Sequence, residues 1–517
     1  MTACLILLPL LAVAAILMGF DPRRTTRVTT SLMLVAGGML AAFWAMGMRD
    51  GLSIAPVVLE KPEIRLGLGL YDGMSVIMML LSVIVAFAAS RTGECEARHS
   101  RLWNISLLLI AAGAVGAFIS TDLFFFYAFH ELALIPTFLM IGILGRGERK
   151  QIAWKATIYL AFGSIVLLAG LLWLVAASGS SSLGFDELLG SSIPAESQRG
   201  ISLFLIFGFG ALVSLFPFHS WAAPAYASAP APISMLHAGV LKKFGLYGLL
   251  RLHPLLPEGM SHWLNLLIAL LIGNILWVGF VTINQKRLDS MLGNSSVMHM
   301  GYIFLAFAAL VGAGSELANP VAKPAAILLM FAHGVTIAML LGLADRIERR
   351  TGTLELRDLG GLASRAPGLA FLFGLAAMAS IGLPGLANFA GEVMVFIAGF
   401  RNWQPGESLG PVQLATIIAL WGLVISAVYM LRAYRRIFQG PEVQATSKSD
   451  DLSRDERPPA VFLAFVLLLV GLFPNLLLGF IDGKEEEPSI DLESITSSIN
   501  VTRDGAAAEN RLPAPGN

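Results

Sequence analysis

The chain has 517 residues, of which 56% are hydrophobic and only 14% are charged. Ordinary soluble domains carry roughly 25% charged residues, so this composition excludes a soluble enzyme, a secreted disulfide scaffold and a disordered hub. Lysine plus arginine equal aspartate plus glutamate at 35 each. The chain therefore has no net positive charge that would attract nucleic acid.

Apolar segments long enough to cross a bilayer recur along nearly the whole chain. The mean hydropathy is +0.74, and a transmembrane helix needs about 20 apolar residues. No basic residue precedes the first segment and Arg23, Arg24 and Arg27 follow it, which favours a retained helix over a cleaved signal peptide. We predict about 14 spans, with boundaries near 4–20, 30–48, 72–90, 102–119, 121–144, 153–177, 201–218, 231–253, 262–284, 294–313, 322–344, 367–399, 412–437 and 459–481.

Basic residues gather in alternate loops between these spans. They are Arg91, Arg98, Arg101, Arg146, Arg149, Lys150, Lys286, Arg287, the basic residues of 346–365, Arg432, Arg435 and Arg436. The positive-inside rule assigns these loops to the cytoplasm. We therefore expect an inner-membrane protein with both termini on the periplasmic side. Cys4 and Cys95 then face opposite sides of the membrane, which argues against a disulfide.

Two of the predicted spans are interrupted. The seventh ends at Pro217 and is followed by a Pro/Ala/Ser stretch over 222–233, and the twelfth contains Gly382-Leu383-Pro384-Gly385. Proline removes a backbone hydrogen bond, and the freed carbonyl needs a partner inside the protein. Broken helices five spans apart are typical of inverted-repeat transporters; ordinary proline kinks are the alternative.

The fold class that follows is an all-α polytopic membrane protein with two inverted five-helix repeats and discontinuous helices 7 and 12. We divide the chain into N-terminal helices (1–101), a first half (102–260), a second half (261–440), a loop and last helix (441–481) and a flexible tail (482–517). The tail is rich in acidic residues, proline, glycine and alanine, which is typical of a solvated segment.

Ionisable residues inside the apolar spans are the candidate functional residues, because a charge at bilayer depth costs several kcal/mol. They are Glu131, Lys242, Lys243, His299, His333 and Glu392, with His219 and His237 as additional candidates. Acid, amine and imidazole groups spread in this way suit a proton relay. Structural ion pairs and hydrogen-bonded core histidines are the alternative, and adjacent Lys242 and Lys243 point about 100° apart, so only one can face a given path. The sequence has no metal-ligand spacing, phosphate loop, nucleotide fingerprint or CxxC, so we expect no cofactor on this chain.

Seven runs of sequence resemble one known family, the antiporter-like subunits of respiratory complex I, and within it subunit M, the counterpart of mitochondrial subunit four. The runs are Tyr71 to Ser75 (D-G-x-S), Phe129 to Pro136 (F-W-E-L-x-L-I-P), Pro217 to Trp221 (P-F-H-x-W), Gly239 to Arg251 (G-x-L-L-K-x-G-x-Y-G-L-L-R), Ser295 to Gly301 (S-S-x-x-H-M-G), Ala332 to Gly334 (A-H-G) and Leu383 to Glu392 (L-P-G…G-E). The resemblance extends from about Asp72 to Pro474. It equates Lys243 with the family lysine, and Glu392 distinguishes subunit M from subunits L and N, where lysine is usual.

The resemblance implies a proton-translocating subunit of an NADH–quinone oxidoreductase, driven by quinone reduction in partner subunits. NADH, FMN, iron–sulfur clusters and quinone would all belong to those partners, and the membrane neighbours would be L-, N- and K-like subunits and the lipid bilayer. Glu131 would modulate a lysine, Lys243 and the histidines would carry protons, and Glu392 would be the exit group.

The sequence departs from the family pattern around the seventh span. The family lysine five residues before Pro217 is Leu212, and the family proline between them is Ser214. A carboxylate common in the fourth helix is Ala111, and D-L-K-R after the ninth reads Arg287 to Ser290.

The missing lysine leaves Glu131 without the partner that the resemblance implies. Either Lys242, where the family usually has leucine, takes over, or the relay is broken. The alternatives to a complex I pump are therefore a subunit of a cation/proton antiporter or another ion-coupled membrane complex, and a non-pumping structural subunit.

Overall fold

A computed structural model gives the structure of residues 1–48 and 52–481. The predicted flexible tail, 482–517, lies outside the described residues. The described residues are almost entirely helical, as predicted, with one short β-hairpin that the sequence did not suggest.

The N-terminal part consists of three helices and the hairpin. Its elements are α1 (Cys4–Leu17), α2 (Pro22–Ala45), β1 (Val57–Glu60), β2 (Glu63–Arg65) and α3 (Gly73–Ala89). Helix α2 begins well before the predicted residue 30 because the Asp21 carboxylate accepts a hydrogen bond from the Arg24 amide at 2.6 Å and Pro22 occupies the first turn. An aspartate N-cap followed by proline is a strong start signal.

The next part contains the first predicted interruption. Its helices are α4 (Ser100–Ile119), α5 (Leu123–Leu144), α6 (Arg149–Ser178), α7 (Phe185–Leu189), α8 (Ala195–Val213) and α9 (Ala222–Ser228). The chain leaves the helical conformation over 214–221, so the break before Pro217 is confirmed.

Two further irregularities follow that the sequence did not predict. The elements are α10 (Ala231–Gly239), a 3₁₀ turn (Leu241–Lys243), α11 (Phe244–Leu252), α12 (Pro257–His262), α13 (Leu264–Ile272), a π-helical segment (Gly273–Val278) and α14 (Gly279–Ile283). The predicted span 231–253 agrees in its bounds with α10 to α11, but the α-helix is interrupted between Gly239 and Phe244. The π segment is explained by Asn274, whose side chain accepts from the Phe216 amide at 2.5 Å and donates to the Ser214 and Val297 carbonyls.

The last part contains the second predicted interruption. Its helices are α15 (Leu288–Ala313), α16 (Ala322–Thr351), α17 (Leu362–Arg365), α18 (Pro367–Ile381), α19 (Ala387–Phe400), α20 (Pro411–Phe438), α21 (Arg457–Leu472) and α22 (Asn475–Ile481). Short 3₁₀ turns occur at Ala97–His99, His253–Leu255 and Leu356–Asp358. The break between α18 and α19 coincides with the predicted Gly-Leu-Pro-Gly sequence.

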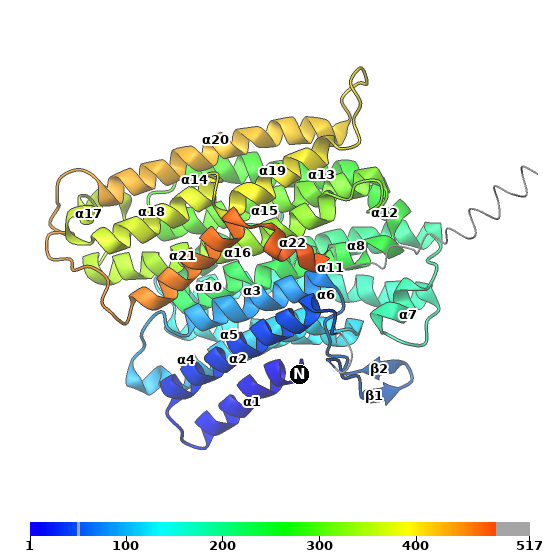
Figure 1. Ribbon diagram of the computed structural model, residues 1–517, viewed down its shortest axis with the longest axis horizontal. Coiled ribbons are helices and arrows are strands. Elements are labelled where there is room, and N and C mark those ends of the chain that lie inside the picture. Colours follow the sequence, from blue (N-terminus) through cyan, green and yellow to red (C-terminus); the bar gives the residue numbers. More distant parts are fainter. Residues whose placement is uncertain (49–51, 482–517) are drawn as a thin grey trace, which may run out of the picture. The chain divides into compact units, whose positions relative to one another are not determined.

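Helices α15 and α16 form the centre of the helical bundle. The apolar windows of these two helices are 89% and 100% buried, against 39–44% for α2, α5, α6 and α20. In Figure 1 α20 lies along one side of α15 and α16, and α1 and α2 lie along the other. Polar groups in the apolar middle of α15 and α16 therefore lie inside the protein and away from lipid.

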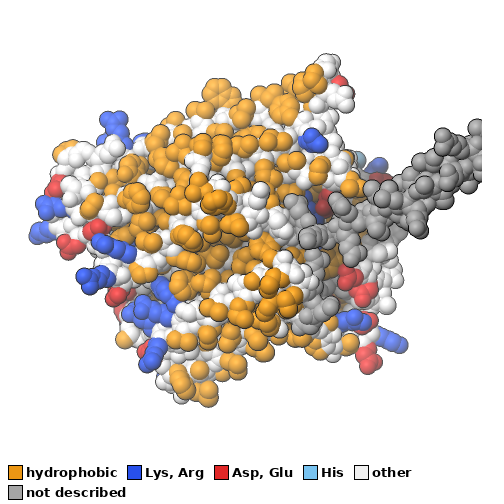
Figure 2. Space-filling view, in the orientation of Figure 1, with side chains coloured by type: hydrophobic (Ala, Val, Ile, Leu, Met, Phe, Trp, Pro, Cys, Tyr) orange, Lys and Arg blue, Asp and Glu red, His pale blue; other side chains and the backbone are white. Residues whose placement is uncertain are grey.

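The described residues include eight helices long and apolar enough to cross a membrane. A ninth candidate is the pair α21 and α22, which bends by 72°, and α1, α3, α18 and α19 are shorter apolar helices. Figure 2 shows a face covered by hydrophobic side chains between two charged ends. The chain is thus a multi-pass helical membrane protein; 14 crossings arranged as inverted repeats stay a prediction.

The basic loops that were predicted to share one side meet at one end of the bundle. Arg349 lies 3.3 Å from Glu94, Arg146 pairs with Glu348, and Arg287 is 3.8 Å from Glu355. Segments far apart in sequence therefore lie together as the charge pattern required.

Candidate functional site

The interruption between α10 and α11 places both lysines in a buried turn. Helix α10 ends at Gly239, which leaves its last carbonyl groups without helical partners. The Lys243 ammonium donates to one of them, the Ala238 carbonyl, at 2.6 Å. Lys242 and Lys243 are 1% and 0% exposed, so the broken helix provides polar partners for cations that apolar packing would exclude.

From Lys242 a line of polar side chains crosses into the central helices. Lys242 Nζ lies 3.4 Å from the Ser296 hydroxyl on α15, and that hydroxyl lies 3.1 Å from Nε2 of His333 on α16. The His333 ring stacks on that of His299, with centroids 5.5 Å apart. The structure thus brings together the predicted residues Lys242, His333 and His299, with Ser296 between Lys242 and His333.

His299 is held by two backbone carbonyl groups. Its Nδ1 lies 2.8 Å from the Ser295 carbonyl and its Nε2 lies 2.9 Å from the Ser380 carbonyl at the end of α18. A neutral imidazole has one N–H and a protonated one has two. Only the protonated ring can donate to both carbonyl groups, so this site accommodates a proton.

The line continues from α15 to α20 and reaches the surroundings of Glu392. The Ser295 hydroxyl is 2.7 Å from the Tyr429 hydroxyl, and the Glu392 carboxylate acts electrostatically on the hydroxyl groups of Tyr429 and Tyr302. Glu392 is 3% exposed, and its Oε1 has no hydrogen-bond partner among the described residues.

Gly382 makes room for the Glu392 carboxylate. Its φ is +79°, which favours glycine, and a Cβ atom at this position would collide with Oε2 of Glu392. The break between α18 and α19 therefore forms the wall against which the carboxylate rests.

Glu131 lies at the other end of the set, on α5. Its carboxylate accepts a hydrogen bond from the Ser164 hydroxyl and lies 3.4 Å from Nδ1 of His130. The side chain is 35% exposed and faces a cavity of about 190 Å³ between α5 and α6. Lys242 bonds to Ser296 and forms no ion pair with Glu131 in the structure, so these two predicted partners are not brought together.

Leu212, which stands where the family pattern has lysine, packs against the helix that also contacts Glu131. It is 3% exposed and lies against Gly163 of α6, next to Ser164, which bonds to Glu131. Ser214, two residues on, adopts φ of +65°, which a proline ring cannot reach. The departures at Leu212 and Ser214 therefore fall at the capped end of α8.

His237 and His219 flank the lysines on the side of the first broken helix. His237 is buried, 3.4 Å from the Tyr226 hydroxyl, and close enough to Lys242 and Lys243 for their charges to interact. His219 lines a cavity of about 570 Å³ that also contains Arg146 and Asp289. Arg146 and Asp289 belong to the end of the bundle where the basic loops meet. His219 therefore lies between that end and Lys242, whose charge acts on the His219 imidazole.

Several residues of this line were not predicted as site residues. Ser295 and Ser296 belong to a recognised motif, and the spacing of four between Ser295 and His299 was the available signal. His130 gave the same signal as the predicted histidines, an imidazole inside an apolar span, and was not selected. Asn274 and Tyr429 gave no signal, because an amide or a tyrosine in an apolar helix is ordinarily packing. Among residues 1–48 and 52–481, no cluster of His, Cys, Asp or Glu side chains is placed to hold a metal ion.

A comparison with known families shows the family to which this chain belongs. The family model described as "NADH:quinone oxidoreductase/Mrp antiporter, TM" matches residues 120–407. The chain belongs to this family. The matched region contains all eight candidate residues, from Glu131 to Glu392.

Curated members of the family cover most of the chain. An NAD(P)H-quinone oxidoreductase chain 4 from Microcystis aeruginosa is 31% identical over 467 residues, 85% of this chain and 83% of the relative. Another, from Synechococcus sp. strain JA-3-3Ab, is 32% identical and covers 92% of this chain and 90% of the relative. The resemblance to the subunit M group, the counterpart of mitochondrial subunit four, is thus confirmed.

Two chains of known structure share the fold. A chain of respiratory complex I from Thermus thermophilus superposes with a TM-score of 0.81 at 27% identity, covering 93% of this chain and 99% of the other. A chain of the Mrp complex from Dietzia sp. superposes with a TM-score of 0.76 at 20% identity, covering 94% and 97%. The second likeness shows the fold alone.

Proposed function

We propose that the chain is a proton-translocating membrane-arm subunit of a complex I-like NADH–quinone oxidoreductase. The observation that carries this proposal is the line of buried ionisable and hydroxyl groups from Lys242 through Ser296, His333, His299 and Ser295 to Tyr429. Buried ionisable groups are expensive in a membrane protein and mark ion pathways. The family match and the chain 4 relatives identify the kind of complex.

In this proposal protons enter from the cytoplasmic end, where the 570 Å³ cavity reaches His219. Lys242 and Lys243 take them up in the broken helix, and the two histidines hold them between α15 and α16. Glu392, beside the second broken helix, releases them on the other side. Each step joins groups that lie within hydrogen-bond or charge-interaction range.

The driving reaction would occur on other chains. Quinone reduction in partner subunits, with their NADH, FMN and iron–sulfur clusters, would change the affinity of this chain for protons. We place it among L-, N- and K-like membrane subunits, in the inner membrane with both termini on the periplasmic side. The grouping of the basic loops at one end of the bundle supports that orientation.

A subunit of a cation/proton antiporter is the second candidate. The family description includes Mrp antiporters, and the Dietzia chain has the same fold. The two curated relatives above favour complex I, since both are NAD(P)H-quinone oxidoreductase chains.

Glu392→Gln tests the proposal, because it removes the charge and keeps the size of the side chain. We expect the assembled complex, purified and placed in liposomes, to lose most or all of its proton pumping per NADH oxidised. Glu407→Gln, at an exposed position, is the matched control and should pump normally. Normal pumping by an intact Glu392→Gln complex would refute the exit role and favour a structural subunit.

A further inference from the structure

His130, which directly precedes Glu131 in the chain, was not among the predicted site residues. It lies on α5, is 2% exposed, and stacks on Phe244 of α11 with centroids 3.9 Å apart. Its Nδ1 lies 3.4 Å from Oε1 of Glu131. Neighbouring residues of a helix point about 100° apart, so sequence adjacency does not by itself bring these two groups together.

Among the described residues, the elements packed around Glu131 place no cation other than His130 within ion-pair distance of its carboxylate. Helix α6 contributes the Ser164 hydroxyl, to which Tyr127 of α5 also bonds, and Leu212 of α8 packs against the neighbouring Gly163. Within the described residues, His130 is the only basic side chain within ion-pair distance of Glu131. A carboxylate in a membrane helix needs such a partner, because an unpaired charge is costly there.

On its other side His130 is connected to the lysines. It is close enough to His237 for their charges to interact, and His237 interacts in the same way with Lys242 and Lys243. Phe244, on which His130 stacks, directly follows Lys243 in the chain. The imidazole thus lies between the carboxylate and the buried ammonium groups.

We propose that His130 is the charge partner of Glu131 and takes the place of the lysine that is absent at Leu212. The pair has no net charge either as imidazolium and carboxylate or as imidazole and carboxylic acid. One proton moves between Nδ1 of His130 and Oε1 of Glu131, and no other bond changes. The pair therefore stores a proton at the head of the relay without placing a net charge in the membrane.

This inference rests on the proposed function, and His130→Phe tests it. Phenylalanine keeps the ring stacked on Phe244 and removes both nitrogens. We expect pumping by the assembled complex in liposomes to fall by about twofold or more, as far as in Glu131→Gln, and the double variant to be no worse than either single one because the two residues act as a unit. His262→Phe, at an exposed histidine, should pump normally.

Leu212→Lys separates the charge of His130 from its packing role, because it restores a cation without restoring the ring. The Leu212 side chain packs against Gly163, which directly precedes the Ser164 that bonds to Glu131, so a lysine at 212 tests whether an ammonium group on α8 can replace the imidazole. We expect Leu212→Lys to restore pumping to His130→Phe and not to Glu131→Gln.

Three outcomes would overturn the inference. They are normal pumping by His130→Phe, losses that multiply in the double variant with Glu131→Gln, and an assembled His130→Phe Leu212→Lys complex that pumps no better than His130→Phe. If Glu392→Gln also pumps normally, the proposed function fails as well; if Glu392→Gln is impaired, only the role of His130 fails.

Discussion

Gly382 and Gly385 differ in one respect that matters for the site. Both have positive φ, +79° and +86°, so alanine is strained at either position by about 1 kcal/mol or more. At Gly382 the added methyl group would also collide with the Glu392 carboxylate, whereas at Gly385 it would meet only Leu472, at 3.8 Å.

We therefore expect Gly382→Ala to displace Glu392 and to reduce proton pumping nearly as strongly as Glu392→Gln, although it removes no ionisable group. Gly385→Ala should cost similar stability and leave pumping close to normal. Pumping in liposomes and the apparent melting temperature of the purified complex separate the two effects. Equal pumping by both alanine variants would show that the wall formed by Gly382 does not position the carboxylate.

The identities of the candidate residues were accessible from sequence, and their partners were not. A charge in an apolar segment is conspicuous, so Lys242, His333 and Glu392 could be singled out without a structure. Which serine or tyrosine joins them depends on how helices far apart in sequence are packed. A pairing of Lys242 with Glu131 was one such prediction, and in the structure Lys242 bonds to Ser296 instead.

At the scale of helices, the two interruptions that contain proline could be predicted and the one at Lys243 could not. Proline leaves a local signal because it lacks the amide hydrogen. The break between α10 and α11 contains no proline and occurs at Val240, with φ of −121° and ψ of −65°. Its stabilising contact, from Lys243 to the Ala238 carbonyl, becomes evident only in the folded chain.

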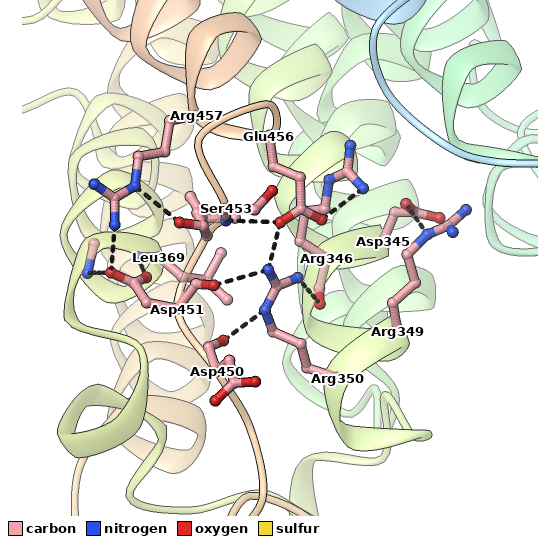
Figure 3. A network of polar contacts seen from close by, with 12 residues as sticks. Asp345, Arg346, Arg349, Arg350, Leu369, Asp450, Asp451, Ser453, Glu456 and Arg457 are labelled. Carbon is pink, nitrogen blue, oxygen red and sulfur yellow. Dashed lines mark hydrogen bonds and ion pairs between the residues drawn. The ribbon is translucent and has the colours of Figure 1, made fainter.

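The loop before α21 is fixed to α16 by a network of ion pairs (Figure 3). Glu456 accepts from Arg350 at 2.6 Å and from Arg346 at 3.0 Å, and the Arg350 side chain also donates to the backbone carbonyls of Asp450 and Asp451. Burial alone would raise the pKa of Glu456, but the hydrogen bonds from Arg350 and Ser453 and the charge of Arg346 outweigh it and lower this pKa to about 2.

A lowered pKa means that the network stabilises the fold at neutral pH and ceases to do so in acid. The contribution is complete above the unfolded value, about 4.3, and is lost as the pH falls toward 2. We expect Glu456→Gln to destabilise the chain by about 1–2 kcal/mol at pH 7. The difference from the parent should shrink between pH 5 and pH 2.

Apparent melting temperatures of the purified protein at a series of pH values measure this effect. Glu442→Gln is the matched control, since its pair with Arg365 is exposed, and it should change the melting temperature much less. A difference between parent and Glu456→Gln that stays constant down to pH 2 would contradict the assignment.

For the whole molecule, the sequence predicted where the helices lie, because the apolar segments that mark them are local features of composition. Each of the predicted apolar segments contains a helix, because burial in lipid requires the backbone to satisfy its own hydrogen bonds. The bend of 72° between α21 and α22 occurs at Pro474, a local signal that the predicted span 459–481 did not use, whereas no local pattern indicated the β-hairpin. The division at 101, 260 and 440 stays a prediction.

The orientation in the membrane is the last prediction, and two exposed loop positions test it. Ser408 lies between α19 and α20, and Lys448 lies between α20 and α21. The connection that contains Lys448 carries the arginines at the end of α20, so the positive-inside rule assigns it to the cytoplasm and assigns Ser408 to the opposite side.

With Cys4 and Cys95 first replaced by serine, Ser408→Cys should react with a membrane-impermeant thiol reagent added to spheroplasts. Lys448→Cys should react only after the membrane is permeabilised. The two positions are separated by the single helix α20, so one of them must be accessible from outside if α20 crosses the membrane once. Labelling of Lys448→Cys alone would invert the topology and reverse the direction of the proposed proton path, while labelling of both would show that α20 does not cross.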